Sequence, residues 1–388
     1  MKNTQQPKFN RLSLNILMLV SVVLIVILSS TGPGTEKLSL PDAPNLNVNT
    51  WQSDSGAIIW YTPQISDSIE VQFWYKAGYR YDQTLKGSAY LLAQLLKYES
   101  KQRSLNMKIS LDQDFIKIGL SLNTNPSTLK RQLSQTSALL YHPVLANNWL
   151  TQLRKNKNSL TDQLRSQAYG EHPYAGPKQG STHSLQSISR QQLQSFHHQY
   201  LHPRRLYMSV VGNVDQQTAQ VITETVLPMS KYLSASELQL KPQGIHQAQS
   251  ADISVVVQPG IKQLNEASHH LLSHVLNQQA PKQVNYQFGQ LNSTVYVQGR
   301  NQVIGQLKQI EQGEFDWDIM LRAKRQIAHT WLKQLQGAQA LSRYLVHLNA
   351  YGLPVNQMAN NLNHLKDIDM DSWQQTSQQL LLALNHSL

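Results

Sequence analysis

Apolar and polar positions alternate along the chain in short runs, which give way to segments with a helical period. Between Asp67 and Gly78 the period is two, as in a strand with one buried face. From Gly87 onward the apolar residues recur on one stripe of a helix, formed by Leu91, Leu92, Leu95 and Leu96. The opposite face of this helix carries Tyr90, Ala93, Gln94 and Lys97. The pattern therefore predicts a strand, a turn and an amphipathic helix in succession.

The same reasoning extends this unit in both directions. Strands are expected at 56–63, in the alternating run 114–122 and after the helix break at Pro203, where a Gly212-Asn213 turn follows. Helices are expected at 126–141 and 147–168. Ser189 and Gln192 form a capping box that opens another helix.

The second half of the chain repeats the first in outline. Residues 229–250 are polar and carry Pro242 and Gly244, so we interpret them as a linker. Beyond this linker, ADISVVVQPG and KQLNEASHHLLSHVLNQ again predict a strand, a glycine turn and a helix. Residues 283–299 are strand-rich in pattern. Helices are expected at 318–336, at 338–350, where Gly352 and Pro354 end the helix, and from a cap at Asp371 to about Asn385.

The N-terminal segment has the features of a membrane anchor. Lys2, Lys8 and Arg11 precede an uncharged, strongly apolar stretch from Leu12 to Ser30. About 20 apolar residues cross a bilayer as a helix, and the positive flank stays in the cytoplasm. We therefore expect a bacterial inner-membrane protein with a cytoplasmic N-terminus (1–11), a single-pass anchor (12–30), a linker (31–50) and the bulk of the chain in the periplasm. The alternative is a cleaved signal peptide.

Composition narrows the function classes. With 388 residues, two domains are expected. The net charge is +11, but only 15% of residues are charged and the basic ones are scattered, so we expect no dedicated nucleic-acid binding. The chain contains no cysteine, which excludes disulfides, thiolate ligands, a cysteine nucleophile and a lipoprotein anchor.

Several stretches together resemble a known family. The turn AGYR followed by GSAYLLAQLL, and the loop YGEHPYAGPKQGSTHSLQSIS, are similar to the pitrilysin/insulinase family of zinc metallopeptidases. The resemblance covers roughly 51–227. It implies an α+β fold of two related α/β-sandwich domains of the LuxS/metallopeptidase-like type. The first, peptidase-like and inactive, would be 51–228, and the second, shortened, 251–388.

The resemblance also identifies what this chain lacks. In the family, a helix carries H-x-x-E-H, whose two histidines hold zinc and whose glutamate activates the metal-bound water. Here these positions read Tyr90, Ala93 and Gln94. The family's third ligand is a glutamate from a downstream helix, but the only acid in 147–168 is Asp162. We therefore assign no catalytic residue and no metal ligand, and expect no zinc cofactor.

Other polar residues have two interpretations each. The five histidines of the first half are expected at turns, caps or the surface: His172, His183, His197, His198 and His202. A second set, spaced four residues apart on one helix, is either a metal site or, as we favour, a solvated face: Glu266, His270 and His274. Lys97 is either solvated or fills the former metal space. Tyr286 matches a family tyrosine that grips peptide, while the arginine expected before it is missing.

These observations favour a membrane-anchored, catalytically inactive metallopeptidase-like protein. It would act as the non-catalytic partner of an active pitrilysin-type paralogue, or as a peptide-binding subunit. The family supplies the analogy, because its two-chain members, such as mitochondrial processing peptidase, combine an active chain with one that lacks the zinc motif. The alternatives are a periplasmic scaffold or assembly protein that retains only the fold, and a residual metallopeptidase with an atypical site.

Overall fold

The computed structural model describes residues 39–145, 159–227, 229, 233–237, 241–242, 244, 246–250, 252–279 and 283–385. The predicted cytoplasmic segment 1–11, the predicted anchor 12–30 and part of the linker 31–50 lie outside these residues. Within the described part, no helix is both long enough and apolar enough to pass through a bilayer. The anchor therefore stays a prediction from the sequence.

The first half forms a mixed six-stranded sheet with the order β1-β2-β6-β3-β5-β4. Neighbouring strands are antiparallel except β2 and β6, which run parallel. The strands are β1 (Asn49–Gln52), β2 (Ile58–Pro63), β3 (Ser68–Tyr75), β4 (Met107–Leu111), β5 (Ile116–Asn123) and β6 (Leu206–Gly212). The central strand β3 is buried along nearly its whole length, because helices cover both faces of the sheet there.

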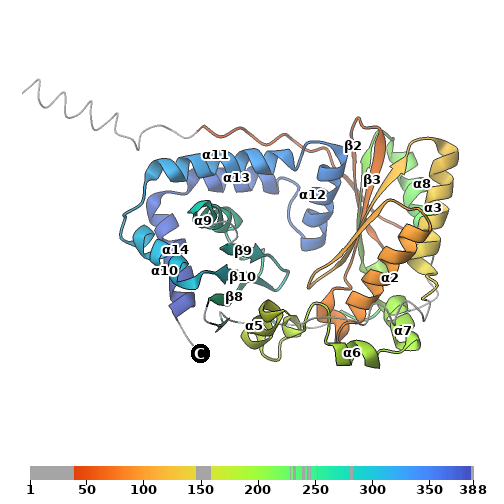
Figure 1. The fold of residues 1–388 in the computed structure, drawn as a ribbon. Helices are drawn as coiled ribbons and strands as arrows, with labels where there is room; N and C mark the ends of the chain where they lie inside the picture. Colours follow the sequence, from red (N-terminus) through yellow and green to blue (C-terminus); the bar gives the residue numbers. More distant parts are fainter. Residues whose placement is uncertain are drawn as a thin grey trace, which may run out of the picture.

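Within the described residues, the outer face of this sheet is covered by four helices, the first three of which the sequence pattern predicts. They are α2 (Ser88–Gln102), α3 (Pro126–Tyr141), α7 (Arg190–Tyr200) and α8 (Gln216–Val226), and Figure 1 shows α2, α3 and α8 beside the sheet. Their leucines, together with the outward side chains of the strands, form one apolar core. Short elements connect them: η1 (Tyr79–Asp82), η2 (Pro173–Ala175), α6 (Thr182–Ser187) and η3 (Pro203–Arg205).

The second half contains a smaller antiparallel sheet and most of the remaining helices. Its strand order is β7-β8-β10-β9, with β7 (Gln247–Gln249), β8 (Ile253–Pro259), β9 (Val284–Gln287) and β10 (Asn292–Gln298). The helices are α9 (Glu266–Gln279), α10 (Arg300–Glu311), α11 (Trp317–Lys333), α12 (Ala338–Tyr351), α13 (Gln357–Asp367) and α14 (Met370–Asn385). The succession of β8 and α9 has the outline of β3 and α2, as the sequence pattern predicts.

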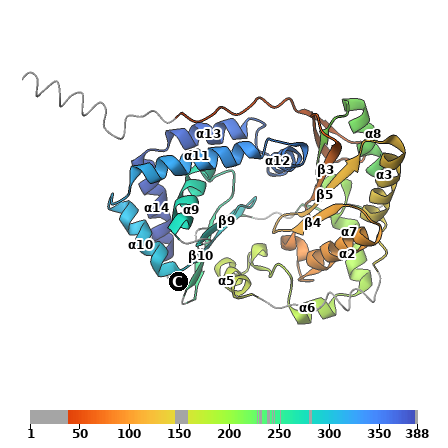
Figure 2. The same cartoon turned by 45° about the horizontal axis from the view of Figure 1, so that its top comes forward.

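Each half lends one helix to the sheet of the other half. Helix α12, from the second half, packs on β3 and β6 of the first sheet. Helix α5 (Leu160–Tyr169), from the first half, packs on β7 and β8, and the Tyr169 hydroxyl lies 3.0 Å from Thr294 Oγ1 of β10. Figures 1 and 2 both show α12 alongside the first sheet and α5 near the second. This exchange fixes how the halves sit relative to each other.

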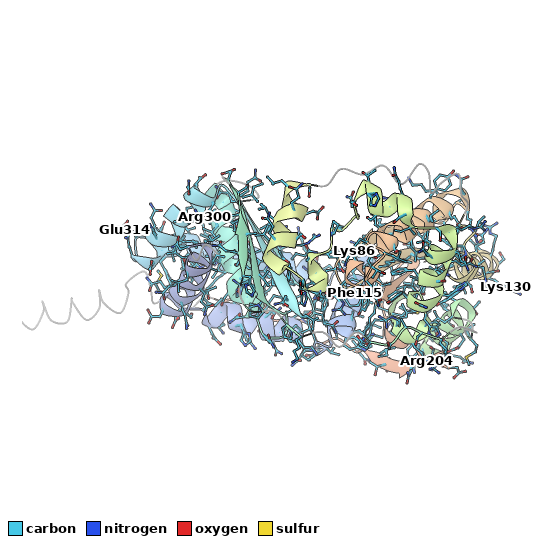
Figure 3. All side chains as sticks on the ribbon, turned by 90° about the horizontal axis from the view of Figure 1, so that it is seen from below. Lys86, Phe115, Lys130, Arg204, Arg300 and Glu314 are labelled. Atoms are coloured by element: carbon cyan, nitrogen blue, oxygen red, sulfur yellow. The ribbon has the colours of Figure 1, made fainter. Side chains whose placement is uncertain are left out.

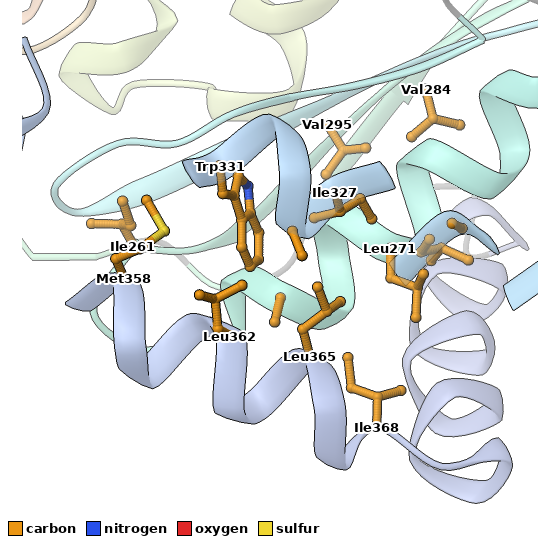
Figure 4. Packing of buried hydrophobic residues seen from close by; sticks show 14 of the residues in the cluster. Ile261, Leu271, Val284, Val295, Ile327, Trp331, Met358, Leu362, Leu365 and Ile368 are labelled. Atoms are coloured by element: carbon orange, nitrogen blue, oxygen red, sulfur yellow. The ribbon is translucent and has the colours of Figure 1, made fainter. Parts of the chain in front are cut away.

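The core of the second half lies between α9, α11, α13 and the small sheet. Figure 4 shows Ile327 and Trp331 of α11 facing Leu362 and Leu365 of α13, with Leu271 of α9 nearby. Burial of an aliphatic or aromatic side chain of this size stabilises the fold by about 1.5–3 kcal/mol. The same apolar cluster continues to Trp74 and Phe115 of the first half, so the two halves share one core.

A buried polar network also joins the halves. Arg80 Nη1 and Asp114 Oδ1 lie 2.8 Å apart, and their side chains are 4% and 0% exposed. The Tyr174 hydroxyl donates to Asp114 Oδ1 over 2.6 Å, and the backbone N–H of Gln290 donates to Asp114 Oδ2 over 3.0 Å. Arg80 Nη2 in turn donates to Gln290 Oε1 over 2.8 Å. The loop before β10 is therefore held against the first half by a charge pair that water does not reach.

The structure corrects some details of the predicted elements. The last helix begins at Met370 and is capped by Asp369, not by Asp371: the Ser372 N–H donates to Asp369 Oδ1 over 2.9 Å, and the Asp369 N–H donates to Ser372 Oγ over 3.1 Å. Asp371 lies inside the first turn. The predicted helix 147–168 is described only from Leu160 onward. Strands β1, β4 and β7 and helices α8, α10 and α13 are additional to those the pattern identifies.

Candidate functional site

The face of the first sheet on which α12 packs, called the inner face here, carries a polar cavity beside the first turns of α12. Its volume is about 380 Å³. The lining side chains come from β3, β5, the strand β4 with its preceding residue, and the first turns of α12. They are Gln72, Trp74, Asn106, Lys108, Ser110, Lys117, Gly119, Leu120, Ser121, Gln339 and Arg343. No acidic residue is among them, so this part of the sheet presents cations and amides.

Strand alternation explains which side chains reach this cavity. Along β4, Lys108 and Ser110 point toward it, whereas Met107 and Ile109 pack on the opposite side with the core beneath α2. β4 ends the sheet and pairs with β5 alone among the described strands. Within the described part of the chain, no further strand covers this edge, although the Met107 N–H already donates to the Leu105 carbonyl, so the edge is open to an added strand.

The cavity floor depends on a glycine. A Cβ added to Gly119 of β5 would lie 2.9 Å from Gln72 Oε1, so the glycine leaves room for this amide to lie across the strand. The amide reaches α12, where Gln72 Nε2 donates to Ser342 Oγ over 3.4 Å. The Ser209 hydroxyl of β6 donates to the Ser342 carbonyl over 2.6 Å. These bonds fix the turn of α12 that presents Arg343 to the cavity.

The three cations of the cavity differ in how they are compensated. Lys117 Nζ lies 2.5 Å from Asp112 Oδ2 and 3.8 Å from the centre of the Trp74 ring. Lys108 and Arg343 are exposed and form no ion pair within the described residues. The site therefore carries a net positive charge that faces the open edge of the sheet.

A second cavity, of about 440 Å³, adjoins the first at Trp74 and Arg343. It is lined by α9, α11, α12 and α13, and Glu266 lies in its wall with a side chain only 16% exposed. Asn361 Nδ2 donates to Glu266 Oε2 over 2.8 Å, and His270 Nε2 lies 3.5 Å from Oε1. Burial acts to raise the pKa of Glu266, but the hydrogen bonds and charge of His270 outweigh it and lower the pKa. Because the two cavities share Trp74 and Arg343 and are lined by residues of both halves, we refer to them together as the groove.

Helix α2 packs against β4 on the face of the sheet opposite the cavity. A carboxylate that precedes the helix in the chain, Asp82, holds the first turn of α2. Its first residues follow Gly87, which has a φ of 101° that favours glycine. The carboxylate of Asp82 accepts the backbone N–H of Gly87 over 2.7 Å and of Ala89 over 2.8 Å. Burial raises the pKa of Asp82 to about 7, against an ordinary 3.8, although both hydrogen bonds act to lower it.

Comparison with known proteins identifies the fold family. A family model described as the inactive domain of M16 peptidases matches residues 187–272. Two uncharacterized zinc proteases, from Mycobacterium bovis and Mycobacterium tuberculosis, are each 37% identical over 59 residues. That match spans 15% of this chain and only 14% of the length of each relative.

Solved structures share the fold over most of the chain. An M16 inactive domain from Pseudomonas fluorescens superposes with a TM-score of 0.72 at 15% identity, covering 86% of this chain and 95% of that one. A protease from Helicobacter pylori gives 0.69 at 14% identity, covering 86% and 97%. This chain thus resembles the inactive domain of the pitrilysin/insulinase, or M16, peptidases in residues 187–272 and shares the fold of such structures over most of its length. The resemblance seen in the sequence is confirmed.

One solved structure of similar fold is about twice as long as the part that this chain matches. The first half of the periplasmic protease PqqL from Escherichia coli matches with a TM-score of 0.64 at 13% identity, covering 89% of this chain and 92% of that half. Against the whole PqqL chain the TM-score is 0.64 at 14% identity, and 47% of PqqL is covered. The described fold thus corresponds to one half of this two-half protease.

The M16 motif positions lie on α2 with side chains that do not fit zinc. Tyr90 is half-buried against the core, where burial raises the pKa of its phenol and keeps it neutral. Ala93 is 4% exposed, and Gln94 offers only a neutral amide. Zinc in proteins prefers imidazole, thiolate and carboxylate ligands. The described residues contain no group of three histidine, cysteine, aspartate or glutamate side chains placed to hold a metal.

The remaining M16 ligand position is not filled by Asp162 in this geometry. Its Oδ1 lies 3.0 Å from Nη2 of the buried Arg165, on the same helix. That helix, α5, packs against the second sheet. Residues 147–158, where the predicted ligand helix begins, lie outside the described residues. A zinc-free protein thus stays a prediction, which the donor chemistry at these positions supports.

The structure agrees with only part of the prediction for the histidines of the first half. His172 and His202 accept the backbone N–H of Tyr174 and Arg204, so they are caps as predicted. His197 is instead a core residue: its Nε2 lies 2.7 Å from the Leu140 carbonyl, and burial lowers its pKa to about 4. The packing of α7 on α2 and the hydrogen bond to the end of α3 bury it, and local sequence does not reveal these long-range contacts.

The stripe on α9 is neither a metal site nor a uniformly solvated face. His274 Nε2 lies 2.8 Å from Gln326 Oε1 of α11, whereas Glu266 and His270 pair with each other in the groove. The predicted solvated face is therefore wrong for Glu266, because α13 covers that turn of α9. Lys97, by contrast, is exposed, as in the solvated interpretation.

Tyr286 lies on β9 at the edge of the second sheet. Its ring stacks on Phe288 with centroids 6.0 Å apart and meets the edge of His269 at 5.2 Å. It does not line either cavity of the groove. Its role in gripping a peptide stays a prediction.

The residues that line the groove form no motif in the sequence. The cations Lys108 and Lys117, which lie at alternating positions of β4 and β5, are the sequence signal that could have identified them.

Proposed function

We propose that this protein is a non-catalytic, peptide-binding subunit of the M16 type. The observation that carries the proposal is the combination of an open edge strand, β4, with a polar groove on one side and a helix without zinc ligands on the other. An extended peptide can add to such an edge through backbone hydrogen bonds, while side pockets select its side chains. Within the described residues, no side chain that lines the groove forms a nucleophile–base hydrogen bond, so we propose binding rather than cleavage.

We further propose that the subunit pairs with an active peptidase of the same family. The support is that the fold matches the first half of PqqL almost completely but less than half of the whole protease. A protein that corresponds to one half of a two-half enzyme has a natural partner in the other half. The apolar stretch 12–30 would hold the complex at the inner membrane, with the groove in the periplasm.

The first test is purification of the native protein in mild detergent, with identification of the chains that accompany it. A stable complex with a relative that carries an intact H-x-x-E-H motif would support pairing. A lone monomer, or only unrelated partners, would contradict pairing and favour a scaffold role. The second test is zinc analysis and casein hydrolysis by the isolated protein. One zinc per chain, lost together with proteolytic activity on chelation, would overturn the inactive assignment.

A further inference from the structure

We propose that the groove selects peptides by their carboxylates, and that it favours an extended segment with acidic side chains at alternate positions. This inference rests on the proposed peptide-binding function and adds the class of peptide to it. The cavity beside β4 is lined by Lys108, Lys117 and Arg343 and by no acid. A carboxylate is the peptide group that such a lining attracts.

The nearby acids do not cancel this charge. Asp112 is engaged with Lys117, leaving two further cations without an ion pair in the described structure. Glu70, on β3, is 4% exposed and accepts hydrogen bonds from the hydroxyls of Ser68 and Ser121, so its carboxylate faces away from solvent. The cavity beside β4 therefore has an excess of positive charge over the stretch that a bound peptide would cover.

Strand geometry supplies the alternate spacing. Lys108 pairs with Gly119 and Ser110 pairs with Lys117 across β4 and β5, so all four residues lie on the cavity face. A peptide added to the open side of β4 places every second side chain on that same face. Residues opposite Lys108 and Ser110 would have Cβ atoms about 4.5–5.5 Å from them. An acid opposite Lys108 lies beside its ammonium group, and acids on this face point toward the cavity that Arg343 of α12 also lines.

The polar neighbours favour a hydrogen-bonded carboxylate over an apolar side chain. Gln72, Asn106 and Gln339 line the cavity with amides, which donate to carboxylate oxygens. Trp74 forms the floor, but its ring is occupied by Lys117 on one face. The site thus offers hydrogen-bond donors in several directions.

The experiment measures binding of fluorescein-labelled peptides, matched in length and strand propensity, with Glu, Gln or Lys at the alternate positions. The full-length protein in detergent is titrated by fluorescence anisotropy at low and high salt. We expect the Glu peptide to bind at least about tenfold tighter than the Gln peptide, with a difference that shrinks as salt screens the charges. Each peptide is made with a free and with an amidated C-terminus, which separates side-chain recognition from recognition of the terminal carboxylate.

Charge-reversal variants test the location. Lys108→Glu and Arg343→Glu are each expected to weaken the Glu peptide about fivefold or more and to leave the Gln peptide nearly unchanged. The matched control is Lys130→Glu on α3, because Lys130 is exposed and Figure 3 places it at the outer side of the first half, away from Phe115. It makes the same change in net charge and should not alter the preference.

The outcomes separate this inference from the function on which it rests. If no peptide binds, peptide binding itself is wrong. If peptides bind but Glu, Gln and Lys versions bind equally, or if Lys130→Glu acts as strongly as Lys108→Glu, the proposed selectivity is wrong while peptide binding stands. If the preference disappears only when the C-terminus is amidated, the protein recognises the terminal carboxylate and not acids at alternate positions. This result would overturn the proposed spacing.

Discussion

Substitution of Asp114 by asparagine should strongly destabilise the protein, because it leaves a buried cation without its partner. Asp114 is fully buried and receives Arg80, the Tyr174 hydroxyl and the Gln290 N–H. Burial acts to lower the pKa of Arg80, but the adjacent carboxylate raises it, so the guanidinium stays charged. The neutral amide of asparagine cannot compensate that charge, and its NH2 group faces donors rather than acceptors.

The expected magnitude follows from the burial of both groups. Removal of one partner from a buried ion pair costs about 3–5 kcal/mol. A globular domain is stable by about 5–15 kcal/mol in total, so this single change removes a large share. Because the network joins the loop at Gln290 to the first half, we also expect the two halves to unfold less cooperatively.

The measurement is urea unfolding, followed by tryptophan fluorescence and far-UV circular dichroism. The control is Glu237→Gln, which removes an ion pair with Lys76 whose acid is half-exposed. We expect this control to cost less than about 1 kcal/mol. A double change to apolar residues, Arg80→Met with Asp114→Leu, should cost less than Asp114→Asn alone, since no unpaired charge remains. The reasoning is refuted if Asp114→Asn costs no more than the Glu237→Gln control.

Three further predictions concern the helix that carries the former motif. Restoration of Tyr90→His, Ala93→Glu and Gln94→His together should give no efficient hydrolysis of casein, because Asp162 is engaged with Arg165; robust turnover would mean that an acid completes the site. Asp82→Asn should remove a pH dependence. The pKa of Asp82 is raised to about 7 from 3.8, so the protonated carboxyl stabilises the folded state. This contribution to the free energy of unfolding is full below pH ~4 and is lost as pH rises through 7, by up to about 4 kcal/mol. In urea titrations, the stability of the wild type minus that of the variant should therefore fall over this window. A difference in stability, wild type minus variant, that grows as pH rises would contradict this prediction. Leu92→Ala, at a fully buried position of α2, should cost about 2–5 kcal/mol in the same assay, whereas Lys97→Ala on the exposed face should change stability by less than about 0.5 kcal/mol.

Local pattern was sufficient for much of the fold. The period of the apolar residues placed α2 and its buried stripe, α3 from Pro126 to Tyr141 and the strand β3, and the Ser189 capping box correctly opened α7. These features depend on neighbours within a few residues, which the sequence lists in order. The loss of the metal-binding positions is likewise a matter of residue identity.

The candidate site could be predicted only in part, because the sequence tells which faces are apolar but not what covers them. The burial of Glu266 depends on α13, that of His197 on α3, and the position of Arg343 on α12, which packs on a sheet from the other half. The pairing of Arg80 with Asp114 and Gln290 likewise joins residues far apart in the chain. The sequence by itself determined most of the helices, the central strands and the missing ligands, but not the edge strand β4. Tertiary packing decided the groove, because long-range contacts bring its charges together on one face of the first sheet.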